Sequence, residues 1–458
     1  MINDLNAISP LDYRYSDDRI IMYLSGKIFV ATQLEVESAL AQTLYEYNLC
    51  SKEIADDISA ACEMVNPNDV YKEEQRIHHD ARAMVNCIKA KLLCPDSGSF
   101  VHFCATSYDI IDTANNIVYF RAINELLIPQ LNDLVKVIIR LTEEEAKTVQ
   151  IGRTHGQHAV PITFGWAMSG YVNRLGEGTL YLENLSKSLS GKFSGAVGAY
   201  NSSSLFLGTA AIQFEKDLLE KLGVYPSSPS TQIIPPEDKN RTFFEILLIA
   251  GIMADLADDM RHLQRTEISE IKEEFEKNQV GSSTMSQKQN PINFENVKGM
   301  WKIVAPRIIT MLMNQMSEHQ RDLTNSVSSR TDSEIIAYTF LMAERLTKTM
   351  AKIIVDQEKM KENLKMQGEL ILAEPIQLLL SFYGCPDAHE KIRILSLESK
   401  EKKISLMELV RKNPEFKDYL ARLTPDQLEI IQSPENYIGL SVQEAEATAI
   451  RWRKILEI

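Results

Sequence analysis

Long stretches of helical hydrophobic periodicity constrain this chain more than any other feature of its sequence. Over residues 131–141 and 243–263, apolar residues recur at the three- and four-residue steps of a single helix face, with polar residues between them. Helix-compatible residues extend the second of these predicted helices to about Lys277. Two further candidates cover residues 294–316, where Pro306 predicts a kink, and residues 332–363. These predicted helices are much longer than the average globular helix, so each carries an apolar stripe that must be buried against another helix.

The pattern predicts an all-α fold with few and short strands. We expect a helical N-terminal domain over residues 1–105, a long-helix bundle over residues 106–362 and a smaller helical C-terminal domain over residues 363–458. Several of the predicted helices are apolar over more than one face, which favours burial between subunits.

The charge balance and the cysteines limit the binding partners and the cellular compartment that are expected for this protein. Lysine and arginine number 49 against 63 aspartate and glutamate, a net charge of −14, so neither nucleic acid nor an anionic membrane is expected as a partner. The six cysteines are scattered and form no C-x-x-C pair, which is typical of a reduced, cytoplasmic protein. The N-terminus has no apolar core of a secretory signal, and residues 243–257 are too short and too charged to cross a bilayer.

Three loops interrupt the helical background and are rich in small and polar residues. They cover residues 104–109, 151–158 and 279–291, each at the end of a long helix pattern. Functional residues concentrate in loops that a rigid scaffold positions, so these segments are the first candidates for a site.

His155 lies in the second loop, between a threonine and a glycine. It is interpreted either as a surface or capping histidine or as a general acid or base that titrates near neutral pH. His155 and His158, with the His78–Asp80 run, also raise the possibility of a metal site. No third ligand lies at a helical spacing, so no metal is predicted.

The third loop contains Ser282 and Ser283 after a glycine, and the charged run 270–277 before it suggests a mobile loop. The simpler interpretation is a helix N-cap beside a solvated linker. A serine that acts as a base needs backbone N–H donors and a nearby cation, for which Lys288 is a candidate. The chain has no Gly-x-Ser-x-Gly motif, which argues against an ordinary serine hydrolase.

Several basic residues are candidates for binding an anion, although an isolated arginine is most often a solvated surface residue. The candidates are Arg14, Lys192, Lys288, Arg321 and Arg330. The segment from Arg321 through Ser326 to Arg330 is a denser polar cluster. The chain has no P-loop, and Gly191, Gly195 and Gly198 do not match the dinucleotide pattern, so arginines, hydroxyls and backbone would have to hold any nucleotide.

Taken together, the three loops resemble the conserved motifs of the fumarase/aspartase superfamily. The run GSSTMSQKQNP at residues 281–291 resembles its signature GSSxMPxKxNP, and TSYD at 106–109 and GRTHG at 152–156 resemble its two other motifs. Within the superfamily the chain is similar to the adenylosuccinate lyases. The features that carry this similarity are Arg14-Tyr15, His79-Asp80, Gln232 and residues 320–330.

The chain departs from the family pattern in two places. Ser286 replaces the signature proline and Gln287 the basic or aromatic residue after it, so the loop is expected to be more mobile. His78 stands where the family has arginine or asparagine, which leaves its role open.

The resemblance implies a homotetramer in which long helices form a central bundle and different subunits share each active site. It implies elimination of fumarate from adenylosuccinate, giving AMP, and from the related succinylaminoimidazole carboxamide ribotide of purine biosynthesis. No metal or redox cofactor is expected, because the elimination moves no net electrons. The alternatives are another fumarate-releasing lyase, such as argininosuccinate lyase, and a non-catalytic structural oligomer.

The resemblance also implies roles for individual residues. Ser282 is the expected base, and His155 is the expected proton donor to the leaving nitrogen. The expected substrate-binding residues are Arg14, Tyr15, His78, His79, Asp80, Thr106, Ser107, Gln232, Ser283, Lys288, Asn290, Arg321, Ser326 and Arg330.

Overall fold

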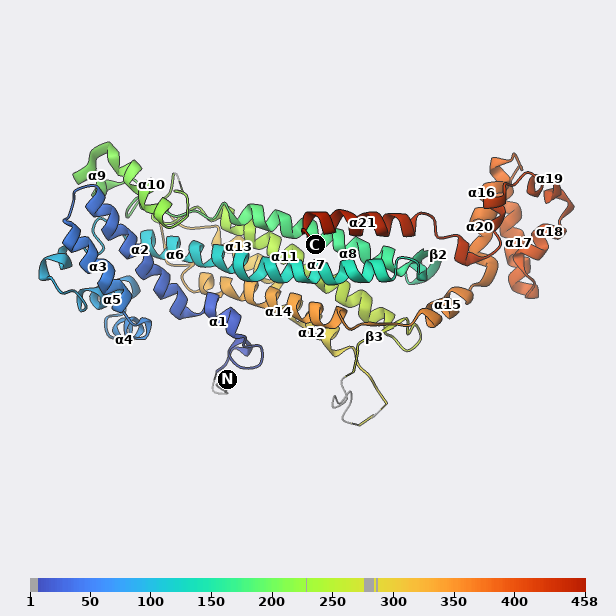
Figure 1. The fold of residues 1–458 in the computed structure, drawn as a ribbon, viewed down its shortest axis with the longest axis horizontal. Coiled ribbons are helices and arrows are strands. Elements are labelled where there is room, and N and C mark those ends of the chain that lie inside the picture. The colour runs from blue at the N-terminus through green and yellow to red at the C-terminus, as the bar shows by residue number, and fades with distance from the viewer. Residues whose placement is uncertain (1–6, 228, 276–283, 286) are drawn as a thin grey trace. The chain divides into compact units, whose positions relative to one another are not determined.

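The computed structural model describes residues 7–227, 229–275, 284–285 and 287–458 (Figure 1). Helices dominate this part of the chain, and its strands form only two short antiparallel pairs, so the predicted all-α class is confirmed. None of the helices described is both long enough and apolar enough to cross a membrane.

The chain divides into two compact units, each built from three separate stretches. The first unit comprises Met1–Leu131, Glu177–Gly251 and Gly299–Glu344, and the second comprises Asn132–Gly176, Ile252–Lys298 and Arg345–Ile458. The predicted division into three consecutive domains stays a prediction.

The first unit has a core of small and branched apolar side chains. Its elements include α1 (Asp18–Leu24), α2 (Gly26–Glu46), α3 (Lys52–Met64), α4 (Pro67–Ile77), α5 (Asp80–Lys89), α6 (Ser107–Arg121), α9 (Asn201–Leu207), α10 (Ala211–Lys221) and α13 (Arg307–Asn314). Helix α2 packs against both α3 and α6, and Leu40, Ile58, Met84 and Phe214 are buried in the shared core. This packing fixes the N-terminal end of α6, which carries the first of the predicted loops.

Five of the helices described have residues in both units. They are α7 (Ile128–Glu144), α8 (Phe164–Ser186), α11 (Glu237–Leu263), α12 (Ile292–Val304) and α14 (Asp332–Met350). Helix α7 confirms the first predicted long helix. Helices α12 and α13 confirm the predicted break at Pro306, which is the N-cap residue of α13.

Two of the predicted helices are shorter than expected. Helix α11 ends at Leu263, because Ser269 adopts a left-handed backbone and the N–H of Glu270 bonds back to Leu263 O at 3.0 Å. Helix α14 ends at Met350, because the β-branched residues after it form β4 (Ile354–Val355), which pairs with β3 (Ile271–Lys272). Asp356 then caps a new helix, α15 (Gln357–Lys365), by accepting the N–H of Lys359.

The second unit contains a β-hairpin and the C-terminal helices. Strands β1 (Val149–Thr154) and β2 (Gln157–Thr163) pair antiparallel. The C-terminal helices are α16 (Ala373–Phe382), α17 (Ala388–Lys402), α18 (Leu406–Lys412), α19 (Lys417–Leu420), α20 (Pro425–Ile430) and α21 (Ser441–Ile455). Trp452 of α21 is fully buried against α8, where a Cβ on Gly176 would lie 2.3 Å from the indole ring.

Candidate active site

The N-terminal end of α6 presents Thr106 and Ser107, the residues predicted to hold the succinyl end of a substrate. Thr106 is the N-cap residue, and its N–H donates to Asp109 Oδ2 at 2.8 Å. Both Thr106 and Ser107 are half-buried. The N–H groups of a helix N-terminus favour anions, so this arrangement suits a carboxylate.

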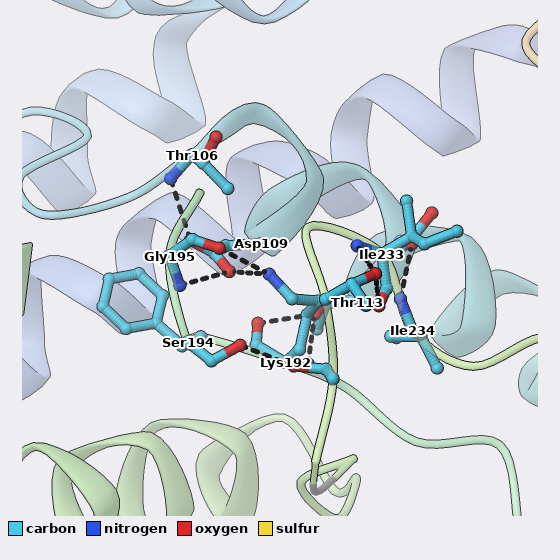
Figure 2. A network of polar contacts seen from close by, with 12 residues as sticks. Thr106, Asp109, Thr113, Lys192, Ser194, Gly195, Ile233 and Ile234 are labelled. Atoms are coloured by element: carbon cyan, nitrogen blue, oxygen red, sulfur yellow. Dashed lines mark hydrogen bonds and ion pairs between the residues drawn. The ribbon is translucent and has the colours of Figure 1, made fainter. Parts of the chain in front are cut away.

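Lys192 was expected as an anion-binding residue, and this prediction is wrong. Its side chain is fully buried, and its ammonium forms an ion pair with Asp109, which is also fully buried (Figure 2). The positive charge of Lys192 is therefore already paired inside the protein. An isolated lysine among small and apolar residues could have indicated burial beside an acid, but the sequence does not identify which acid.

The structure brings Gln232 and Arg321 next to α6. The N–H of Gln232 donates to Gln320 O at 3.3 Å, which joins the two predicted segments directly. The guanidinium of Arg321 lies 3.6 Å from the centre of the Tyr108 ring and donates to its hydroxyl. Tyr108 follows Ser107 directly, so Gln232, Arg321 and Ser107 belong to one cluster.

A second pair of predicted segments also meets in the first unit. A guanidinium nitrogen of Arg330 lies 3.9 Å from Asp80 Oδ2, and Nδ1 of His79 lies 3.7 Å from Asp80 Oδ1. His79 caps α5 by accepting the N–H of Arg82 at Nδ1, so a neutral His79 carries its proton at Nε2. His78 ends α4 with a left-handed backbone, at φ 57°.

Three predicted phosphate-binding residues lie in turns outside these clusters. The N–H groups of Arg14 and Tyr15 both donate to Pro10 O, and the N–H of Ser326 donates to Leu323 O. Within the residues that the structure describes, no hydrogen bond or ion pair joins Arg14 or Ser326 to Arg321 or Arg330.

His155 lies at the tip of the β1–β2 hairpin, where a loop without strands was expected. Thr154 pairs with Gln157, so the turn has two central residues, His155 and Gly156, at φ 54° and 71°. Left-handed backbone at both central positions is the geometry of a type I′ turn, which suits glycine. A left-handed histidine is uncommon, and strained positions cluster at functional sites. The side chain of His155 is exposed.

A buried carboxylate anchors the base of this hairpin. Glu270 is fully buried and accepts two hydrogen bonds from Arg153, at 2.5 and 3.1 Å. Gln150 and Asn363 also donate to it, at 2.7 and 2.8 Å. The predicted mobile loop at Ser282 and Ser283 lies outside the described residues. The charged run before it begins in the core, because its first carboxylate, Glu270, is buried.

The suggested metal site at the two histidines gains no further ligands. His158 lies opposite Arg153 in the hairpin, and burial, then the nearby guanidinium, lowers the pKa of its imidazole. No group of three or more histidine, cysteine, aspartate or glutamate side chains is arranged to hold a metal ion in the part of the chain described.

The third predicted loop lies partly outside the described residues, including Ser282 and Ser283. Lys288 and Asn290 are described, and both line an open hollow of about 860 Å³. Five further charged or titratable residues line the same hollow and were not predicted from the sequence. They are Arg261, His262, Arg265, Glu267 and Glu295. Arg261 and His262 end α11, and a helix C-terminus favours positive side chains, so the end of that helix pattern was the available signal.

The chain matches two protein families in succession. Residues 7–305 match a family described as lyase, and residues 317–428 match one described as adenylosuccinate lyase C-terminal. The chain is 36% identical to the adenylosuccinate lyase of Pyrococcus abyssi over 442 residues, which cover 94% of this chain and 95% of the relative. It is 32% identical to that of Methanocaldococcus jannaschii over 444 residues, covering 95% of this chain and 94% of the relative.

Solved structures share the fold at lower identity. A fumarate lyase from Mesorhizobium sp. BNC1 aligns with a TM-score of 0.82 and 23% identity, covering 95% of this chain and 98% of that structure. The 3-carboxy-cis,cis-muconate lactonizing enzyme from Pseudomonas putida aligns with a TM-score of 0.82 and 23% identity, covering 97% of this chain and 98% of that structure. These two likenesses establish the fold alone.

Proposed function

The chain belongs to the adenylosuccinate lyase family and is a C–N lyase, and we propose that it eliminates fumarate from adenylosuccinate to leave AMP. We further propose the succinylaminoimidazole carboxamide ribotide of purine biosynthesis as a second substrate. The observation that carries the proposal is the cluster at α6, where Thr106 and Ser107 lie beside Arg321. It offers helix N–H groups, hydroxyls and a cation to an anionic substrate.

The first step removes a proton from the Cβ of the succinyl group, next to a carboxylate. The electron pair of the C–H bond moves onto that carboxylate, which becomes a doubly charged aci-carboxylate. Only preorganised donors and a cation make such a species accessible. We assign the base to Ser282, which lies outside the described residues, with Ser283 beside it. Lys288 and Asn290 are the proposed cation and amide, and this role is supported because both line one hollow.

The second step breaks the C–N bond, and the leaving nitrogen needs a proton. We assign this proton to His155, because an imidazole is suited to proton transfer near neutral pH. Its place at the exposed tip of a hairpin whose base is anchored supports the assignment. His79 would orient His155 or a substrate group through Nε2.

The rest of the nucleotide needs partners for its phosphate and for the succinyl end. We propose that Thr106, Ser107 and Gln232 hold the succinyl end. The residues proposed for the phosphate and the remaining nucleotide are Arg14, Tyr15, His78, Asp80, Arg321, Ser326 and Arg330. Asp80 would keep Arg330 in place when no phosphate is bound, since the two side chains lie 3.9 Å apart.

Fumarate release from adenylosuccinate, followed by ultraviolet absorbance, tests this function. We expect turnover with the purified chain and inhibition by free AMP. Turnover of argininosuccinate without inhibition by AMP would favour the alternative lyase, which has no phosphate to bind. No turnover of either substrate by folded protein would favour a non-catalytic oligomer.

We also propose that the protein is a cytoplasmic homotetramer with shared active sites. Apolar side chains exposed on its helices support burial against other copies, among them Leu248 at 63% and Met313 at 62%. Light scattering should give the mass of four subunits. If His155 and Ser282 of one site come from different subunits, mixing His155→Ala with Ser282→Ala chains should restore activity after subunit exchange. No recovery after complete exchange would contradict shared sites.

A further inference from the structure

One fully buried ion pair in the first unit has no part in the elimination steps above. Lys192 and Asp109 both have fully buried side chains, and they bind each other at the N-terminal end of α6 (Figure 2). Removing two charges from water is costly, and a buried ion pair often contributes little net stability. A role other than stability is therefore expected for this pair, and its contacts indicate which role.

Asp109 uses its two carboxylate oxygens for different partners. Oδ2 accepts the N–H of Thr106 at 2.8 Å, and Oδ1 accepts the N–H of Gly195 at 3.2 Å together with the Lys192 ammonium (Figure 2). The orientation of this carboxylate therefore determines where the backbone of Thr106 lies. Ser107 follows immediately, so both residues proposed to hold the succinyl end depend on it.

Lys192 is itself held in one position. Its N–H donates to the Thr113 hydroxyl at 3.0 Å, and that hydroxyl donates to Lys192 O at 3.1 Å. Thr113 lies one helical turn after Asp109 on α6. The backbone of Lys192 is thus fixed to the same helix whose first turn its ammonium binds, which leaves Asp109 little freedom to turn away from Thr106.

The chain that follows Lys192 also contacts the segments just before Thr106 and Gln232. Ser202 donates to Cys104 O at 2.8 Å, two residues before Thr106. Ser194 shares a 2.6 Å hydrogen bond with Ser230, two residues before Gln232. Gly198 has a left-handed backbone, and a Cβ there would lie 2.0 Å from Ser230 O, so the close approach requires glycine.

We propose that the Lys192–Asp109 pair is a positioning device that sets Thr106 and Ser107 for the fumarate half of the substrate. The inference rests on the proposed role of these two residues in binding the succinyl end. Neither Lys192 nor Asp109 touches the substrate. They act through the Thr106 N–H, so losing the pair should weaken fumarate binding far more than AMP binding.

Two double variants separate positioning from simple stability. Asp109→Asn with Lys192→Met, and Asp109→Leu with Lys192→Met, both remove the two buried charges. Only asparagine keeps an oxygen that can accept the Thr106 N–H. Product inhibition constants for fumarate and for AMP, with kcat and KM for adenylosuccinate, are measured for each variant and for the wild type.

We expect the leucine variant to bind fumarate about 10- to 100-fold more weakly than the asparagine variant, a loss typical of residues that orient ligand-binding groups. Inhibition by AMP should stay within about threefold of the wild type in both variants. Equal fumarate inhibition in the two folded variants would overturn the proposal. If the leucine variant does not fold, the single Asp109→Asn variant is compared with the wild type instead. Asparagine has one side-chain oxygen in place of two, so it cannot accept both the Lys192 ammonium and the Thr106 N–H in the native arrangement. An equal loss of fumarate and AMP affinity there would also overturn the proposal.

Lys187→Met is the matched control. Its side chain is 57% exposed and pairs with Glu183, four residues earlier in the chain, so activity and both inhibition constants should match the wild type. If the wild type itself does not release fumarate, the proposed function fails. If the wild type is active while the leucine variant keeps normal fumarate affinity, only the positioning role fails.

Discussion

The loop before α6 and the β1–β2 hairpin each depend on a buried carboxylate, but at different distances from the predicted chemistry. Asp109 binds the N–H of Thr106 itself, a proposed substrate-binding residue. Glu270 binds Arg153, two residues before the hairpin tip, and leaves the His155 side chain exposed. The backbone of the proposed substrate-binding residue Thr106 is therefore held directly by a buried carboxylate. At the hairpin, the buried carboxylate holds only the backbone below His155, the proposed proton donor.

The largest loss of activity is expected from substituting the exposed residue at the hairpin tip. His155→Ala should lower kcat by about 10²–10⁴-fold, the usual contribution of a general acid, and leave the melting temperature unchanged because the side chain is exposed. Steady-state kinetics and thermal unfolding measure both. His389→Ala, at an exposed position of α17, is the control. A large drop in melting temperature would show that His155 supports the fold.

Substituting Glu270, the buried carboxylate at the base of the hairpin, should in contrast lower the stability of the protein. Glu270→Ala leaves Arg153 without its partner in a largely buried position, and breaking a buried pair typically costs about 3–5 kcal/mol. The melting temperature should fall clearly, and kcat should fall with it because the hairpin base loosens. Glu274→Ala removes a carboxylate that is 48% exposed and should change little. Equal melting temperatures for the two variants would show that Glu270 is no anchor.

Substituting Arg330, a proposed phosphate-binding residue, should have an intermediate effect, and it should appear in substrate binding. Arg330→Ala should raise KM for adenylosuccinate, since a charge-assisted bond to a phosphate is worth about 1.5–3 kcal/mol. Arg76→Ala, at an arginine that is 68% exposed and pairs with Glu73, is the matched control. An unchanged KM would remove Arg330 from the site.

The smallest effect concerns His102, which lies near α6. Burial alone would lower the pKa of its imidazole, but the Glu37 carboxylate 2.5 Å away raises it above 6.5. The folded protein therefore holds this proton more tightly, so the pair stabilises fully below pH 6.5 and the gain is lost as pH rises through the native pKa. His102→Asn, which suits the left-handed backbone there, should lower the melting temperature more at about pH 6 than at about pH 9. A gap that widens with pH would contradict this.

The fold class could be predicted from local periodicity, because the apolar residues of a helix face recur at three- and four-residue steps in the sequence. Helix α7 was predicted in this way, and the break at Pro306 was predicted from the proline itself. The ends of α11 and α14 were not, because the left-handed Ser269 and the β3–β4 pairing depend on tertiary contacts. The hairpin at His155 was missed for a different reason, because its two-residue turn carries histidine where glycine or asparagine is usual.

The candidate site was predicted unevenly. Motif residues such as Thr106 and Gln232 could be named, and the structure brings them together around α6. The buried partners Lys192 and Glu270 could not, because pairing between residues more than eighty positions apart leaves no local signal. Lys192 was taken for an anion-binding residue because sequence gives charge but not burial.

Calorimetric titration of AMP tests most directly whether catalysis depends on the hairpin tip and nucleotide binding on the first unit. The titration compares the wild type with His155→Ala and Arg330→Ala at one protein concentration. If chemistry resides at the hairpin tip and binding resides in the first unit, Kd for AMP should be unchanged in His155→Ala and raised about tenfold or more in Arg330→Ala. A raised Kd in His155→Ala with an unchanged Kd in Arg330→Ala would contradict the account.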